Sequence, residues 1–350
     1  IPSAYQQKLS YTNVFNKPGS GANSTYADIL RDGGGNWVLQ RGAIHGIGQN
    51  TKSITVKDGS KTYQAGIQSI GADTTVLTFD SATKAKLNIT KVYQGYVEGL
   101  MSHQLKIHLN NVDNILSDSL LLTEKLLTEI PQQVKLEADE TKADYTLSLR
   151  NGRAVLTRPN DHFRPLVEPI VLDSEAFAFQ LVKDFKHLSN RHFLKDLRND
   201  SALNNPLKIE VTDAQGQPIS VKNNAVELHY DLINNQWKGG IGVKITNPTS
   251  QKLYFCCLYL DTRFGSSLEL LEPTVTPLDP GASKQLSYRG NTTIPMFLES
   301  HVRLYNWPKN VEYLQFIVST EDLSNVEELN LESLPTPFTL KKKATMRSLG

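Results

Sequence analysis

The first candidate for chemistry in this sequence is a histidine held between glycines. The stretch GNWVLQRGAIHGIGQNT, residues 35–51, carries Trp37, Arg41 and His45, and glycines around His45 let the backbone turn tightly there. A His-Gly pair suggests a Cys–His dyad, in which an imidazole activates a thiolate and backbone N–H groups stabilise the oxyanion. Such a dyad needs a cysteine at a strand end or a helix start.

The cysteines do not fit that role. Cys256 and Cys257 are adjacent in LYFCCLYL, the most apolar run of the chain. Such a run is typical of a strand buried on both faces, with one thiol pointing to each face. Adjacent cysteines do not easily bridge each other, and by themselves they are not a zinc ligand set. A buried structural pair is therefore favoured over a nucleophile, and His45 is interpreted as a structural or ligand-contacting residue.

Other catalytic and metal-binding patterns are missing from the sequence. The eight histidines form no HExxH motif and have no cysteine at ligand spacing, so no metal ion is expected. There is no GxxxxGK[ST] loop and no GxGxxG before a helix. The close carboxylates Asp139/Glu140 and Glu269/Glu272 lack flanking aromatic residues that would hold a sugar. The sequence predicts no catalytic residue and no cofactor in this chain.

Arginines recur at predicted turns, and NGRAVLTRPNDHFRP holds a cluster of them. The planar guanidinium fork suits phosphate and carboxylate groups. Two interpretations stay open: a solvated hairpin with surface ion pairs, or a pocket for an anionic small molecule or an acidic partner segment. The turn arginines are Arg41, Arg153, Arg158, Arg164, Arg263 and Arg289.

Composition limits the partners and the compartment. The 350 residues include 37 basic and 36 acidic side chains, a net charge of +1, which gives no general reason to expect nucleic acid or an anionic membrane as partner. No run resembles a membrane span, and the N-terminus lacks the regions of a signal peptide. These features predict a soluble, cytoplasmic protein. The start at Ile1 is interpreted as that of a fragment, processed or expressed separately.

The elements that position these residues are mainly strands, and the length predicts several domains. Turn signals at Asp58-Gly59 and Asn151-Gly152 predict hairpins. Phe177, Leu181, Phe185 and Leu188 recur at helical spacing behind a predicted N-cap at Ser174. The predicted order is a flexible lead-in (1–24), a small all-β barrel or sheet (25–100), an α+β unit (101–172), a helix or broken helix pair as connector (173–205), an immunoglobulin-like β-sandwich (206–325) and a tail (326–350).

Several stretches together resemble the non-catalytic C-terminal region of bacterial caspase-like proteases of the metacaspase or orthocaspase type. They are NWVLQRGAIHGI, KADYTLSLRNGRAVLTRPND, GVKITNPTSQKLYFCCLYLDTRFG, LDPGASKQLSYRG and VEYLQFIVSTEDL, spread in order over residues 26–325. In that family the catalytic domain lies upstream, with a histidine before a glycine and a cysteine in an acidic loop bordered by Gly and Ser. This chain has AIHGI but no such cysteine loop.

The resemblance implies an accessory region that senses a ligand, restrains the protease or grips substrate, in a bacterial antiviral protein that undergoes proteolytic processing. It implies a caspase-like catalytic domain or chain as partner and a nucleotide-type signal as ligand. The alternative is a β-rich scaffold or adhesion protein that binds another protein or a glycan. The ligand-binding residues that follow from the first interpretation are Trp37, Arg41, His45, Tyr145, Arg153, Arg158 and Arg263.

Overall fold

The computed structural model describes residues 26–48, 51, 53–59, 61–98, 103–113, 117–128, 130, 133–172, 176–197, 206–234, 236–307, 309–323 and 326–337. The predicted lead-in at 1–24 and the predicted N-cap Ser174 lie outside these residues. The fold is mainly β, as predicted, and forms two compact units. Unit 1 comprises Ile1–Gln104, Phe185–Leu298 and Val311–Ser333; unit 2 comprises Leu105–Asp184, Glu299–Asn310 and Leu334–Gly350.

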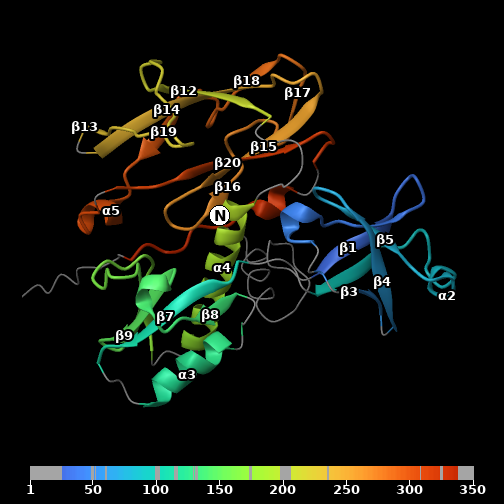
Figure 1. Ribbon diagram of the computed structural model, residues 1–350, viewed down its shortest axis with the longest axis horizontal. Coiled ribbons are helices and arrows are strands. Elements are labelled where there is room, and N and C mark those ends of the chain that lie inside the picture. Colours follow the sequence, from blue (N-terminus) through green and yellow to red (C-terminus); the bar gives the residue numbers. More distant parts are fainter. Residues whose placement is uncertain are drawn as a thin grey trace, which may run out of the picture. The chain divides into compact units, whose positions relative to one another are not determined.

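The first part of unit 1 is a closed six-stranded barrel, which confirms the predicted small β-barrel (Figure 1). The strand order is β1-β2-β5-β4-β3-β6, and pairing of β6 with β1 closes it. The alternation in SITVKD buries Ile54 and Val56, and Gly59 makes the predicted turn at φ 60°. The elements are β1 (Tyr26–Arg31), β2 (Trp37–Leu39), β3 (Ser53–Asp58), β4 (Lys61–Ile70), β5 (Thr75–Thr78), helix α2 (Ser81–Lys84) and β6 (Tyr93–Glu98).

The turn after β2 has the tight geometry that its glycines predict. A 3₁₀ helix, η1 (Ala43–His45), ends at Gly46, whose φ of 87° lies in the left-handed region that favours glycine. The amides of Ala43 and Ile44 donate to the carbonyls of Gly71 and Ala72. The turn is thereby fastened to the loop between β4 and β5.

Unit 2 has the α+β character expected of its sequence. Its sheet has the order β11-β10-β9-β7-β8, with β7 parallel to both β8 and β9. Strands β7, β8 and β9 are labelled in Figure 1. Asn151 and Gly152 both adopt positive φ, 50° and 67°, and form the predicted hairpin. The elements are β7 (Leu105–Asn111), α3 (Ser117–Thr128), β8 (Val134–Leu136), η2 (Glu140–Lys142), β9 (Tyr145–Arg150), β10 (Arg153–Thr157), β11 (Ile170–Val171) and, from later in the chain, α5 (Ser300–Leu304).

Helix α4 (Phe177–Asp196) is continuous, so the alternative of a broken helix pair is wrong. The four apolar residues that predicted it are at most 2% exposed. The division between the units falls inside this helix, after Asp184. Among the described residues, no helix is both long and apolar enough to span a lipid bilayer.

The remainder of unit 1 contains two sheets that share an apolar core, with Val243 and Ile245 of one sheet beside Phe255 and Cys257 of the other. In the second sheet β15 and β20 run side by side (Figure 1). The first sheet contains β12 (Lys208–Asp213), β13 (Asp231–Ile233), β14 (Gln236–Thr246), β18 (Ser283–Gln285) and β19 (Ile294–Phe297). The second contains β15 (Leu253–Leu260), β16 (Ser266–Ser267), β17 (Thr276–Leu278) and β20 (Tyr313–Ser319).

Two stretches of the sequence that have a strand-like composition are mostly irregular in the structure. Of AVELHYDL, 225–232, only the last two residues belong to β13, because β12 already occupies that edge of β14 from Ile241 onward. Of KQLSYRG, 284–290, only the first two belong to β18, because the chain turns at Arg289 and Gly290, which have positive φ.

The segment predicted as a tail begins as ordered structure. Val326 and Leu329, in the 3₁₀ helix η3 (Val326–Leu329), are 2% and 1% exposed and belong to an apolar core with Cys256. Leu331 then pairs with Ser266. Residues 338–350, with the basic end of the chain, lie outside the described residues.

Candidate functional site

The predicted ligand-binding residues are divided between the two units. Trp37, Arg41, His45 and Arg263 belong to unit 1, and Tyr145, Arg153 and Arg158 belong to unit 2. Whether they bind a ligand stays a prediction. Their surroundings differ, and each group is described by itself.

Arg41 is a buried member of an ion pair. Its side chain is 1% exposed, and Nη2 lies 2.7 Å from Oε2 of Glu328 in η3. Burial lowers the pKa of Arg41, although the carboxylate opposes this effect. Burial also raises the pKa of the Glu328 carboxyl, against the attraction of Arg41. The pair joins the barrel turn to η3, residues 326–329. Burial of the two charges costs free energy, and their close pairing offsets that cost.

His45 and Trp37 are both buried, each 6% exposed. The Gly42 amide donates to Nδ1 of His45 over 3.1 Å, so Nδ1 is an acceptor and the imidazole closes the turn. The Trp37 ring packs edge-to-face against Phe79 and Tyr93 in the barrel core. In this structure both side chains serve packing and turn geometry.

In unit 2, Arg158 is the predicted site residue that meets an aromatic ring at the surface. Its Cζ lies 3.9 Å from the centroid of the Trp307 ring, and the arginine is exposed. Arg153, in the hairpin, is also exposed, whereas Tyr145 is buried and only 7% exposed. A guanidinium stacked on an indole combines a cationic fork for phosphate with an aromatic face for a planar ring.

Arg263 lies in a turn that is fastened to α4. Asp261 Oδ1 accepts hydrogen bonds from the amides of Arg263 and Gly265, at 2.9 and 2.6 Å. Arg191 of α4 donates through Nε to the Gly265 carbonyl at 3.2 Å and through Nη2 to the Asp261 carbonyl at 3.3 Å. His187, with Nε2 2.8 Å from the Phe264 carbonyl, adds a third link.

The cysteine prediction is confirmed. Cys256 and Cys257 are 0% exposed in β15, and they face different apolar cores. Burial raises the pKa of Cys256 to about 12 and raises that of Cys257 further. A thiol in such surroundings stays protonated and covered, which is the opposite of an activated nucleophile.

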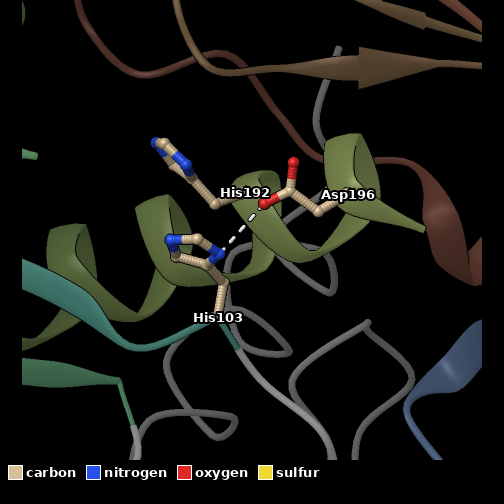
Figure 2. A group of neighbouring side chains, drawn as sticks. All are labelled: His103, His192 and Asp196. Atoms are coloured by element: carbon tan, nitrogen blue, oxygen red, sulfur yellow. Dashed lines mark ion pairs between the residues drawn. The ribbon is translucent and has the colours of Figure 1, made fainter. Parts of the chain in front are cut away.

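A cluster that the sequence interpretation missed consists of two residues of α4 and one residue from the segment before β7. His103 Nδ1 is 3.1 Å from Asp196 Oδ2, and the rings of His103 and His192 have centroids 4.8 Å apart (Figure 2). One ligand atom from each residue lies within 4.8 Å of the others, an arrangement that could hold a metal ion. All three residues belong to unit 1.

The missed signal was partly present in the sequence. His192 and Asp196 are four residues apart on a helix, which puts them on one face. Folding alone brings His103 to that face, because it is far from His192 in the sequence. Motifs of closely spaced histidines therefore could not reveal the group.

Asp184, also on α4, has a raised pKa, and this predicts that its replacement by a neutral residue stabilises the fold. Asp184 is 7% exposed, and burial raises the pKa of its carboxyl to about 6, although the hydrogen bond from Gln180 Nε2 at 2.6 Å opposes this. Because the folded-state pKa exceeds the unfolded one, stability is lost as pH rises from about 4 to about 6. We expect Asp184→Asn, which keeps the acceptor for Gln180, to gain up to about 3 kcal/mol at pH 7.

Urea unfolding of the wild type and the variant between pH 4 and pH 7.5 measures this difference. The gain should shrink to about 0.5 kcal/mol near pH 4 and should vanish only well below the unfolded-state pKa of 3.8, where the carboxyl is protonated in both states. The exposed Glu321→Gln serves as control and should show no such trend. Equal stability of the wild type and Asp184→Asn at pH 7 would contradict the burial argument.

Comparisons of the chain with protein-family models, with curated proteins and with solved structures return no match.

Proposed function

We propose that this chain is an accessory, regulatory and ligand-sensing region of a bacterial caspase-like cysteine protease that acts in antiviral defence. The ordered segments over residues 26–325 that resemble that family support the proposal. In it, the immunoglobulin-like sandwich and the barrel are binding and restraining parts. The peptidase chemistry belongs to a catalytic domain or chain outside these residues.

The observation that carries the proposal is the state of the two thiols. They are the only cysteines of the sequence, and both are enclosed in β15 with raised pKa values. A cysteine protease that contains this chain must therefore draw its thiolate from another segment. That requirement fits an accessory region better than a self-contained enzyme.

The ligand-sensing part of the proposal rests on Arg158 and Trp307. The exposed guanidinium over the indole offers charge for a phosphate and a ring for stacking with a base. A nucleotide-type signal has both groups. Arg153, at the start of the strand β10 that ends directly before Arg158, is a second exposed cation, and it provides a comparison for the role of the aromatic contact.

The proposal is tested with the protease assembled from this chain and the caspase-like catalytic domain that its coding region is expected to contain. Peptidase activity should appear on addition of a cyclic or ADP-ribose-type nucleotide. Cys256→Ala and Cys257→Ala should retain it, whereas loss of the catalytic domain's cysteine should abolish it. Arg158→Gln should weaken the response to nucleotide by about 10- to 100-fold, because a charge-assisted contact contributes about 1.5 to 3 kcal/mol.

Controls separate the parts of this proposal. Arg153→Gln removes an exposed arginine that has no stacked indole among its described contacts, and it should respond like the wild type. If a folded Cys256→Ala or Cys257→Ala variant loses all activity, the assignment of an accessory role is wrong. A coding region without a caspase-like domain would also overturn it, and activity that ignores every nucleotide would remove the sensing role alone.

A second function, a β-rich scaffold that binds a protein or a glycan, is favoured by apolar exposure at one end of the β13–β14 hairpin. Leu232 is 56% and Trp237 37% exposed, and the two residues pair across the strands. Phe297 on β19, paired with Lys238, is 53% exposed. Exposed aromatic and aliphatic side chains on a sheet are typical of binding surfaces.

A further inference from the structure

His103, His192 and Asp196 form a group of potential ligands whose geometry needs little change to hold an ion. Zinc binds imidazole nitrogens and carboxylate oxygens at about 2.0 to 2.2 Å, so adjacent ligand atoms of a tetrahedral site lie about 3.3 to 3.6 Å apart. His103 Nδ1 and Asp196 Oδ2 are 3.1 Å apart, a few tenths of an ångström from that range. The widest separation in the group is within 4.8 Å, which rotation of the side chains can close.

The donor set indicates which ions would fit. Two imidazoles and one carboxylate suit zinc and related divalent transition ions, whereas magnesium and calcium prefer oxygen ligands alone. The side chains of His103 and Asp196 are 29% and 45% exposed, so an ion could enter from solvent. Water would complete the coordination, as it does at zinc sites with three protein ligands.

Hydrogen bonds to other segments fix both α4 and His103 in place. Ser189 Oγ, one turn before His192, donates to the His103 carbonyl over 2.6 Å and thereby holds the residue beside the helix. The opposite side of α4 is fixed through Arg191 to the carbonyls of Asp261 and Gly265. Gln315 Nε2 donates to the Leu197 carbonyl, directly after the helix, at 3.1 Å. Ligands on such a supported element keep their positions.

We propose that His103, His192 and Asp196 bind one divalent transition ion of the zinc type, with His103 from the segment before β7 and the other two ligands from one face of α4 (Figure 2). The ion replaces the direct contact between His103 and Asp196 and clamps the segment to the helix. The site is independent of the proposed protease function, since it lies on residues with no role in that proposal.

The test uses tag-free protein stripped with EDTA and titrated with zinc chloride by calorimetry, with cobalt(II) absorption as a second readout. We expect one zinc ion per chain, a raised thermal unfolding midpoint, and no binding of magnesium at the same concentrations. His103→Gln, His192→Gln and Asp196→Asn should each weaken binding by at least about 100-fold, and Ser189→Ala by about 10-fold.

His229→Gln is the matched control, since His229 is an exposed histidine of the same unit and should leave zinc binding unchanged. Circular dichroism confirms that each variant is folded. The proposal is overturned if stripped wild type binds no zinc, or if His192→Gln and Asp196→Asn bind it as tightly as the wild type. In either case the group is an ion pair between His103 and Asp196 only.

Discussion

Glu328→Gln is expected to lower the free energy of unfolding by about 3 kcal/mol, because it removes the charge that compensates the buried guanidinium of Arg41. The Arg41 side chain is 1% exposed and Glu328 Oε2 lies 2.7 Å from Nη2. Desolvation already disfavours both charges. Removal of one partner therefore leaves the cost of burying the other. Urea unfolding followed by tryptophan fluorescence measures the change.

The neighbouring Glu327→Gln is the control for this prediction, because Glu327 is exposed in the same short helix and should change stability by less than about 0.5 kcal/mol. The double variant Arg41→Met/Glu328→Gln should recover much of the loss, since neither residue then buries a charge. A Glu328→Gln variant as stable as Glu327→Gln would show that the ion pair carries no stability.

Gly42→Ala is the second substitution expected to have a large effect. A Cβ at this position would lie 2.6 Å from each of three backbone atoms: the Asp73 nitrogen, the Gly71 oxygen and the Thr74 nitrogen. Backbone atoms cannot rotate away as a side-chain end can, so the turn must separate from the β4–β5 loop. We expect a loss of about 3 kcal/mol in unfolding free energy.

Hydrogen exchange gives a local reading of the same change. The amides of Ala43 and Ile44, which donate to Gly71 and Ala72, should exchange faster in Gly42→Ala. Gly33→Ala is the control, because its Cβ would meet no heavy atom within 4 Å and should leave stability nearly unchanged. Unaltered exchange at Ala43 and Ile44 would contradict the predicted clash.

Local patterns in the sequence predicted the elements whose structure depends on neighbouring residues. Asn151-Gly152 and Asp58-Gly59 made the expected hairpins because their backbone angles suit glycine and asparagine. The helical spacing of apolar residues predicted α4. The stretch AVELHYDL, 225–232, is mostly irregular although its alternation suits a strand, because β12 occupies the edge of β14 from Ile241 onward. The alternation of apolar and polar residues within one segment does not show which distant strand that segment will pair with.

The same distinction applies to the candidate sites. LYFCCLYL alone determined that both cysteines would be buried, since an unbroken apolar strand buries both of its faces. The sequence also placed an arginine and a histidine in a glycine-rich turn. Only the tertiary structure decided that Arg41 faces Glu328, that Arg158 lies over Trp307, and that His103 meets His192 and Asp196. These contacts join residues far apart in the chain, and folding of the whole chain, rather than any local preference, brings them together.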